Sequence, residues 1–513
     1  MAENITMTTV NNNKRIAKNT MMLYIRMILV MGITLFTSRI ILDALGEENY
    51  GIYNVVGGVV AMFGFFSSTL ASSCQRYFSY YIGKDDKKEL SKVFRLNMSV
   101  FILLALVVLF IAETIGLWFI NTKLNIEESR IFAMNCVYQC SLLSFFCSIV
   151  LVPYNALIIS YEKMSAFAYI SIVEVLLKLL LAILLTYLLF DKLILYAVMM
   201  LFCQVIITLY YYIYCQRNIA ESKYAFYWEK DRFKEILSYS GWHLIGALSV
   251  IVKNQGVNIL INTFYNPIVN AGRAIAFQVT TATDSLSNNF FVAAKPQIYK
   301  YYAQKDYEEL HKLILRSSKV CFLLILIIAI PLLINTSAIL SLWLKNVPSY
   351  AILFTQLALI NAVIDSMNGP AIASALATAN IKKFELITGS LMILNLPVSY
   401  IVLKMGAIPE MTIIVSIVIS LVTIIVRAFI LKELIHLSVI EYIQKTFLPL
   451  MFVGIISGIL SYGISIFFKD GLFRIMVTSI ISVCIIVIFF YIICLSKSEK
   501  IAISNFIKNK IKK

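Results

Sequence analysis

Long apolar segments recur along the whole 513-residue chain, separated by short polar connectors. A helix needs about 20 mostly apolar residues to cross a membrane, and fourteen stretches meet this requirement. Hydrophobic residues make up 60 % of the chain and charged residues 14 %, an excess that one soluble core could not bury. Soluble and disordered classes are excluded, and the sequence predicts an all-α polytopic membrane protein. The spans are predicted at 18–42, 50–72, 93–117, 130–152, 165–190, 193–215, 236–262, 266–291, 312–335, 350–376, 384–405, 409–432, 445–467 and 472–495.

Basic residues are unevenly distributed among the connectors. Of the 44 Lys and Arg residues, 32 fall at loops and helix ends on one side of the predicted membrane, and seven on the other. Because basic loops stay in the cytoplasm, both termini are expected there. The same bias explains the net charge of +16, so no nucleic-acid partner is expected. The three histidines and nine cysteines show no metal-binding spacing, and we expect neither a metal nor another cofactor.

The fourteen spans divide into two groups of six and a final pair. Paired bundles around a central site are a common plan among transporters, and a polar first helix recurs in both groups. The predicted parts are a cytoplasmic N-terminus (1–17), an N-lobe (18–215), a cytoplasmic linker (216–235), a C-lobe (236–434), the final pair (445–495) and a basic cytoplasmic tail (496–513).

Charged side chains also occur inside the predicted spans, although a charge at membrane depth is costly and commonly marks a pathway. Glu174 and Lys178 lie four residues apart with the acid first, which favours an ion pair along one helix face, and we interpret this pair as structural. The other charges are Arg26 and Arg39 in the first span, Lys253 in the seventh, Arg273 and Asp284 in the eighth, and Asp365 in the tenth.

Amide side chains accompany these charges. In the tenth span Asn361, Asp365 and Asn368 follow the spacing of one helix face, and Gly369-Pro370 comes next, where a kink is expected. The predicted polar lining of a cavity consists of Asn254, Gln255 and Asn258 from the seventh span and Asn361 and Asn368 from the tenth.

These residues predict a polar cavity shared by the first, seventh, eighth and tenth spans. Its basic excess favours an anionic solute, bound by Arg26, Arg39, Lys253 and Arg273. Asp284 and Asp365 are candidates for coupling transport to a proton or sodium gradient. The alternative is that the polar groups only hold helices together.

Four sequence motifs allow a family to be recognised. The stretch TSRIILDALGEENYGIYNVV at 37–56 resembles the first-hairpin pattern of bacterial polysaccharide exporters, as do QGVNIL at 255–260, NAGRAIA at 270–276 and PQI at 296–298. On these motifs the chain resembles the Wzx-type oligosaccharide flippases of the multidrug/oligosaccharidyl-lipid/polysaccharide (MOP) superfamily.

The resemblance implies two six-helix lobes that form a V and open alternately to each side of the bacterial cytoplasmic membrane. It implies a cargo of undecaprenyl-diphosphate-linked oligosaccharide, moved from the inner to the outer leaflet for O-antigen, capsule or exopolysaccharide synthesis. A polysaccharide polymerase and a chain-length regulator are then expected partners, besides membrane lipids. Arg39 and Arg273 fall inside matched motifs, whereas Arg26 and Lys253 depend on position alone.

Three other classes remain open. A lipid II-type flippase and a MATE-like drug or cation antiporter share the fold, although the antiporter favours an anionic cavity. A membrane glycosyltransferase or polymerase would need an external catalytic loop, and the longest loops on that side, 118–129 and 336–349, are short and poor in carboxylates. We therefore expect a transporter and not an enzyme.

Overall fold

The computed structural model describes residues 2–61, 64–123, 127–265, 267–344, 347–348, 350–468, 471–497 and 499–501, with side chains from Arg15 onward except at scattered positions. It is 89 % helical, and the described residues contain no strand, which confirms the all-α prediction. By its contacts the chain divides into two compact units, 1–244 (unit 1) and 245–513 (unit 2), and their boundary falls inside one helix.

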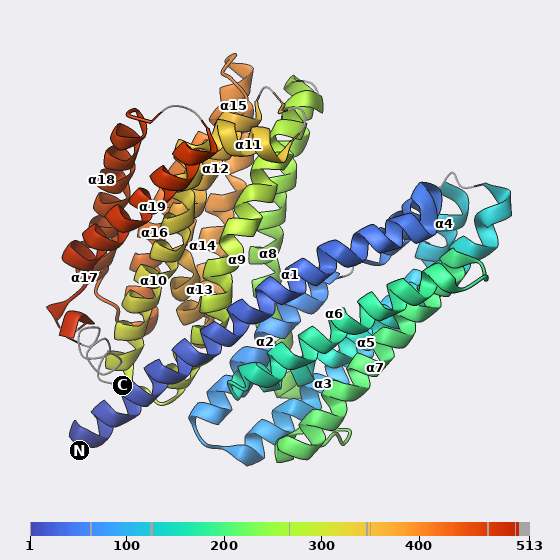
Figure 1. Ribbon diagram of the computed structural model, residues 1–513. Helices are drawn as coiled ribbons and strands as arrows, with labels where there is room; N and C mark the ends of the chain where they lie inside the picture. The colour runs from blue at the N-terminus through green and yellow to red at the C-terminus, as the bar shows by residue number, and fades with distance from the viewer. Residues whose placement is uncertain are drawn as a thin grey trace, which may run out of the picture. The chain divides into compact units, whose positions relative to one another are not determined.

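Unit 1 begins with a long helix and continues as a bundle, in which α5 packs along α7 and α1 along α6 (Figure 1). Its elements are α1 (Ala2–Ala61), α2 (Gly64–Gly83), α3 (Lys87–Ile111), the π-turn η1 (Ala112–Gly116), α4 (Leu117–Lys123), η2 (Glu128–Arg130), α5 (Ile131–Ser160), α6 (Met164–Tyr187), α7 (Lys192–Asn218), η3 (Ala220–Ser222) and the start of α8 (Lys230–Phe264).

Unit 2 is built around α9, which packs on α10 and α12. Its elements after α8 are α9 (Pro267–Ala303), α10 (Tyr307–Ile334), α11 (Thr336–Trp343), α12 (Ala351–Asp365), α13 (Asn368–Ala377), α14 (Lys382–Ile393), α15 (Asn395–Lys404), α16 (Met411–Ile435), α17 (Val439–Tyr442), η4 (Ile443–Phe447), α18 (Leu448–Ser465), α19 (Leu472–Phe489) and η5 (Phe490–Cys494).

Eleven helices in the described part are long and apolar enough to cross a membrane, or twelve if the pair α12–α13, bent by 41° next to Gly369-Pro370, counts as one span. The count of fourteen is therefore not confirmed. The predicted span 50–72 contains residues outside the described part. Of the predicted span 266–291, residues 267–291 form most of α9, which is rich in Thr, Ser and Asn and is not apolar enough to qualify. The bend matches the kink expected in the tenth span.

The break in α1 lies at Gly46. Its φ of 77° and ψ of 165° are not helical, and this positive φ is a conformation that glycine adopts without steric cost. The segment Arg15–Gly46 is thereby separated as a span of its own, and the chain resumes as a second helical segment within α1.

Tyr138 stabilises the π-turn that follows α3. The Tyr138 hydroxyl donates a hydrogen bond of 2.8 Å to the carbonyl oxygen of Ala112, and the Tyr138 side chain is fully buried. A Cβ added at Gly116 would lie 2.1 Å from that hydroxyl, so glycine is required by close approach. The π-turn thus depends both on the Tyr138 hydroxyl and on the absence of a side chain at Gly116.

Matching turns show that the two units share one helical plan. Asp86 and Asp306 cap α3 and α10, each accepting a bond from the backbone N–H three residues later, at 3.0 and 3.1 Å. The preceding residues, Asp85 and Lys305, have φ of 53° and 58°. The two caps are 220 positions apart.

A second pair of turns follows the same plan. Glu162 after α5 and Ala379 after α13 have φ of 58° and 61°, and each lies nine residues after a proline, Pro153 or Pro370. These turns are 217 positions apart. The six-helix repeat expected from span counting thus has a counterpart in local backbone geometry.

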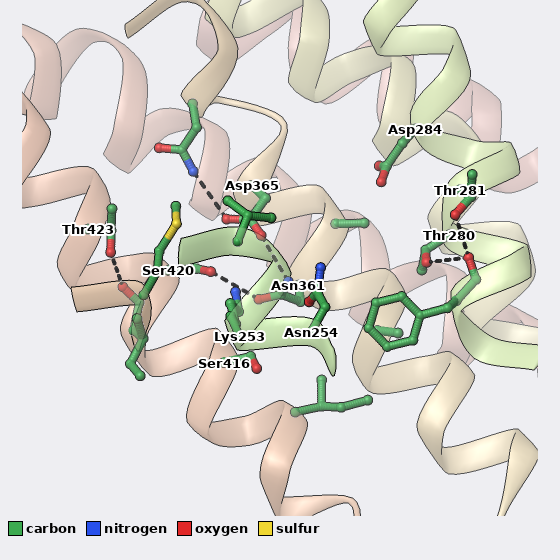
Figure 2. Close-up of a pocket in the computed structure, with 18 of the residues that line it drawn as sticks. Lys253, Asn254, Thr280, Thr281, Asp284, Asn361, Asp365, Ser416, Ser420 and Thr423 are labelled. Atoms are coloured by element: carbon green, nitrogen blue, oxygen red, sulfur yellow. Dashed lines mark hydrogen bonds between the residues drawn. The ribbon is translucent and has the colours of Figure 1, made fainter. Parts of the chain in front are cut away.

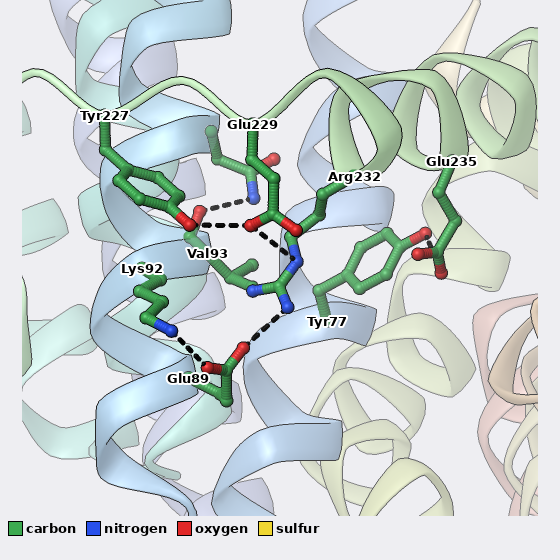
Figure 3. A network of polar contacts seen from close by, with 9 residues as sticks. Tyr77, Glu89, Lys92, Val93, Tyr227, Glu229, Arg232 and Glu235 are labelled. Atoms are coloured by element: carbon green, nitrogen blue, oxygen red, sulfur yellow. Dashed lines mark hydrogen bonds and ion pairs between the residues drawn. The ribbon is translucent and has the colours of Figure 1, made fainter.

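The start of α8 is joined to α2 and α3 by a polar network within unit 1 (Figure 3). Arg232 lies between two carboxylates, with its Nη2 2.6 Å from Oε2 of Glu89 and its Nε 3.5 Å from Oε2 of Glu229. Hydrogen bonds from Lys92 to Glu89 (2.8 Å), from Tyr227 to Glu229 (2.6 Å) and from Tyr77 to Glu235 (3.1 Å) complete the network.

Candidate functional site

A cavity of about 480 Å³ lies inside unit 2, at the depth of its membrane helices. Its walls come from α8, α9, α12, α13 and α16, with one residue from α14. Figure 2 shows amide, hydroxyl and charged side chains from several of these helices around it. The charged lining residues in the described part are Lys253, Arg273 and Arg427 against Asp284 and Asp365, which is a cationic excess of one if all are ionised.

Arg273 is the basic group that the protein positions most tightly. Its side chain is only 4 % exposed, and its Nη1 donates to the side-chain oxygen of Asn258 and, at 3.2 Å, to the backbone oxygen of Asn254. The guanidinium also stacks on the ring of Phe277, 4.6 Å from the centroid. Its buried Nε–H has no partner in the described part of the chain, which is costly, and Arg273 lines the cavity, where a bound anion would offset part of that cost.

Lys253 differs from Arg273 because nothing in the described residues holds its ammonium group. It is partly buried, lines the cavity and forms no ion pair or hydrogen bond there. A buried cation without a counter-ion is costly, and a bound anion would relieve that cost.

The two acids of the cavity differ in how they are bound (Figure 2). Asp365 accepts hydrogen bonds from the amides of Asn361 (2.9 Å) and Asn368 (3.1 Å), and Asn361 in turn accepts one from Ser420 (3.2 Å). Asp284, on α9, accepts none from the described residues. Asp365 is thus a carboxylate fixed by donors, whereas Asp284 is free to bind a proton or a cation.

One wall of the cavity is missing from the sequence prediction. Ser416, Ser420, Thr423 and Arg427 on α16 all line it, and Arg427 is 3 % exposed, lies over the ring of Phe384 and has a buried Nε without a partner among the described residues. Their spacing of four, three and four residues follows one helix face, a signal present in the sequence. Arg427 lies five residues before the end of its predicted span, so its position does not mark it as a charge at membrane depth.

Three of the five amide residues predicted to line a cavity lie at this one. Asn254, Asn361 and Asn368 line it. Asn258 does not line it but holds Arg273 and bonds to Gln255 (3.0 Å), and Gln255 is exposed, away from the lining.

The remaining predicted basic residues belong to unit 1. Arg26 stacks on the ring of Phe167, 4.4 Å from its centroid, and interacts electrostatically with Glu174. Arg39 is exposed on α1. Glu174 and Lys178 form the expected ion pair, at 2.6 Å.

Comparison with solved structures identifies the fold. A MATE transporter in complex with MaD3S superposes with a TM-score of 0.70 at 15 % identity, covering 82 % of this chain and 97 % of that one. An outward-facing multidrug resistance MATE family transporter of the MOP superfamily gives 0.70 at 15 %, over 82 % and 96 %. A MOP superfamily transporter from Pyrococcus furiosus Vc1, described as having a binding pocket of reverse polarity, gives 0.67 at 15 %, over 81 % and 96 %.

Comparison of sequences identifies the family. The family model described as polysaccharide biosynthesis protein matches residues 16–302, more than half of the chain, while no curated protein matches. The family and the structural neighbours are transporters and not enzymes. The chain is a multi-pass membrane protein with a MATE-like fold, and it belongs to the polysaccharide biosynthesis protein family, a flippase family of the MOP superfamily.

Proposed function

We propose that this protein is a flippase for undecaprenyl-diphosphate-linked oligosaccharides, which it moves from the inner to the outer leaflet of the bacterial cytoplasmic membrane by alternating access. Such a cargo carries a diphosphate that cannot cross hydrocarbon unaided, because burial of its charge would cost many kcal/mol. A transporter for it therefore needs a polar cavity at membrane depth with donors for phosphate oxygens.

The observation that carries this proposal is the state of the basic residues in the unit 2 cavity. Arg273 is held in position yet keeps a donor without a protein partner, and Lys253 has no counter-ion in the described residues. Guanidinium and ammonium groups are the side chains that bind phosphate. In unit 1, Arg26 and Arg39 are proposed to contribute further cationic contacts along the path.

Coupling to an ion gradient is proposed to depend on Asp284 and Asp365. Asp284 lines the cavity without a hydrogen bond from the described residues, so binding of a proton or sodium ion there would change the cavity charge. Asp365, fixed by two amides, is the second carboxylate that lines this cavity. The structural alternative is that Asp284 only compensates nearby cations.

A reconstituted assay tests the proposal directly. Purified protein in lipid vesicles is given a short undecaprenyl-diphosphate-linked oligosaccharide, and a lectin measures how fast the saccharide appears on the opposite leaflet. We expect saturable flipping, inhibited by free diphosphate-linked saccharide. Flipping no faster than in protein-free vesicles would reject the proposal, and export of an organic cation instead would favour the antiporter class.

Both termini are proposed to be cytoplasmic, in line with the distribution of basic residues. Reporter fusions after Lys234 and at Lys513 should both give a cytoplasmic signal. A polysaccharide polymerase and a chain-length regulator are proposed as partners, which affinity capture from cross-linked membranes would test.

A further inference from the structure

A second cavity, of about 230 Å³, lies inside unit 1, away from any residue assigned above to the substrate. It is lined by the part of α1 after Gly46 and by α5, α6 and α7, which pack on one another, and it is open on one side. Its polar lining includes Ser144, Lys178 and Gln204, each near the middle of its predicted span. The cavity is therefore at membrane depth.

Three of the polar side chains in this cavity have no hydrogen-bond partner among the described residues. The side chains of Ser141, Ser144 and Gln204 make no hydrogen bond within the described part of the chain. The Nζ of Lys178 donates to Oε1 of Glu174 at 2.6 Å, which holds the ammonium group at the cavity wall and leaves it two further donors. Polar groups without partners are costly inside a membrane, so the cavity is suited to a polar occupant.

The shared helical plan places this cavity at the position of the unit 2 cavity. The caps Asp86 and Asp306 relate α1 to α9 by a shift of 220 positions. This shift carries the lining residues Tyr53, Gly57 and Val60 onto positions 273, 277 and 280, all of which line the unit 2 cavity.

The other walls correspond in the same way. The turns at 162 and 379 relate α5 to α12 by 217 positions, which carries Ser141 and Ser144 onto Ala358 and Asn361, both in the unit 2 lining. The helix starts at 192 and 411 relate α7 to α16 by 219 positions and carry Gln204 onto Thr423, also in that lining. Two cavities at corresponding positions are better explained by a shared binding role than by chance packing defects.

The chemistry of the two cavities differs. In unit 1 the arginine of position 273 is replaced by Tyr53, and the only charged lining residue in the described part is Lys178. Hydroxyl and amide groups both donate and accept, whereas phosphate oxygens only accept. Sugar hydroxyls donate and accept in the same manner, which matches the unit 1 lining.

We propose that the unit 1 cavity is a saccharide subsite, which binds one sugar ring through Ser141, Ser144, Gln204 and the ammonium group of Lys178. The identification of the ligand as a sugar rests on the proposed function. The size of the cavity limits the subsite to about one ring, so the rest of an oligosaccharide lies outside it.

Gly57 offers a way to close this subsite without disturbing the fold. It lines the cavity, and a Cβ added there would meet no atom within 4 Å. Gly57→Leu should therefore fill the cavity, and the exchange favours the helix in which it lies. Gly463→Leu is the matched control, since Gly463 lies in α18, has equally open surroundings and does not line the cavity.

The binding test uses Cys140, a free thiol that lines the cavity. Purified full-length protein is treated with methyl methanethiosulfonate, with and without soluble glucose, galactose, N-acetylglucosamine or glucuronate, and labelling is followed by peptide mass spectrometry. We expect at least one sugar to slow Cys140 labelling about threefold or more, and Gly57→Leu to slow it without sugar. The exposed Cys484 should be unaffected. Equal labelling of Cys140 with every sugar overturns the proposal and leaves a water-filled cavity.

The transport test separates this proposal from the proposed function. In the vesicle assay, Gly57→Leu should reduce flipping about tenfold or more at normal abundance, while Gly463→Leu flips at the wild-type rate. If the wild type flips and Gly57→Leu flips equally well, the subsite is wrong and the flippase function stands. If the wild type does not flip, the flippase function fails, and protection of Cys140 alone decides the subsite.

Discussion

Arg232 and Glu89 form an ion pair of 2.6 Å between α8 and α3, with exposed side-chain fractions of only 19 % and 25 %. Each has a second partner, Glu229 for Arg232 and Lys92 for Glu89. A partly buried network of this kind loses more when one charge is removed than an isolated surface pair does. The contact therefore fixes the beginning of α8 against α3.

Charge reversal at this contact should destabilise the protein. Arg232→Glu places a third carboxylate beside Glu89 and Glu229 and is expected to cost on the order of 1.5–3 kcal/mol, seen as lower membrane abundance and a lower unfolding temperature in detergent. The double exchange Glu89→Arg/Arg232→Glu should recover part of the loss. Lys445→Glu, in a pair whose side chains are 68 % and 41 % exposed, is the control and should have little effect. A double variant no better than the single would argue against direct pairing.

Arg273 should contribute to cargo binding through a charge-assisted contact. Loss of one such contact costs about 1.5–3 kcal/mol, so Arg273→Ala should weaken cargo affinity roughly tenfold to hundredfold. Arg273→Lys should recover only part, since the charge remains but the planar fork of donors is lost. The measurement is the concentration dependence of flipping, beside membrane abundance, with Lys253→Ala, Arg26→Ala and Arg39→Ala in parallel. Normal flipping by all four alanine variants at normal abundance would remove the cationic site.

The two acids of the unit 2 cavity should respond differently to neutralisation. Asp284→Asn removes a carboxylate without hydrogen bonds from the described residues, so the protein should insert normally but lose its dependence on an imposed proton or sodium gradient. Asp365→Asn sets an amide donor against the amides of Asn361 and Asn368, so reduced abundance is expected. Gradient dependence retained in both variants would end the coupling role.

The π-turn after α3 gives a prediction about stability alone. Tyr138→Phe removes the side-chain donor to the buried carbonyl of Ala112, which keeps the backbone N–H of Leu117, and should cost about 0.5–1.5 kcal/mol. Gly116→Ala should be at least as harmful, because its methyl carbon would overlap the Tyr138 hydroxyl. In the double variant Gly116→Ala/Tyr138→Phe that clash is relieved, so the two losses should be less than additive in thermal unfolding. Simple additivity would mean that the Tyr138 hydroxyl and residue 116 do not contact each other.

Acid should loosen the segment that follows α19. Partial burial works to raise the pKa of Glu499, but the backbone N–H of Ser496 and the cations Lys319 and Arg316 outweigh it and hold the pKa below its ordinary value of 4.5. The stabilising contribution of this carboxylate is therefore complete above pH 4.5 and is lost as the pH falls through its lowered pKa. Proteolysis near Ser496 by an acid-active protease should increase over that range. With a protease active at neutral pH, Glu499→Gln should be cleaved there more readily than the wild type, and equal protection of both proteins would refute the contact.

The sequence predicts the structure best where apolar or charged side chains can lie in only one kind of environment. Apolar length predicted nearly all the membrane helices, and charges at membrane depth indicated Lys253, Arg273, Asp284 and Asp365, which one cavity brings together. The kink beside Pro370 was also predictable, because a proline leaves a backbone acceptor without its donor.

Other features could not be read from periodicity. The positive φ of Gly46 and the fit between Tyr138 and Gly116 depend on contacts that only the fold creates. Arg427 lies five residues before the end of its predicted span, where hydropathy alone does not separate a residue at membrane depth from one at a helix end. Near the turns at 86 and 306 the units do share side chains at a shift of 220, such as Asp86 with Asp306 and Glu89 with Glu309. That stretch is short, so the correspondence between the units becomes evident only from the matched backbone geometry.

The helix α8 runs without a break from Lys230 to Phe264, across the boundary between the two units at 244 and 245. A gene split at that boundary would cut the helix and expose its backbone donors and acceptors on both fragments. The segment 223–229, which has no regular secondary structure, is the better place for a cut. The second fragment would then carry Arg232 and its partner Glu229, and the first would carry Glu89. Reassembly of the two fragments in a membrane would make the Arg232–Glu89 contact an interface between separate chains, whose strength could be titrated with salt.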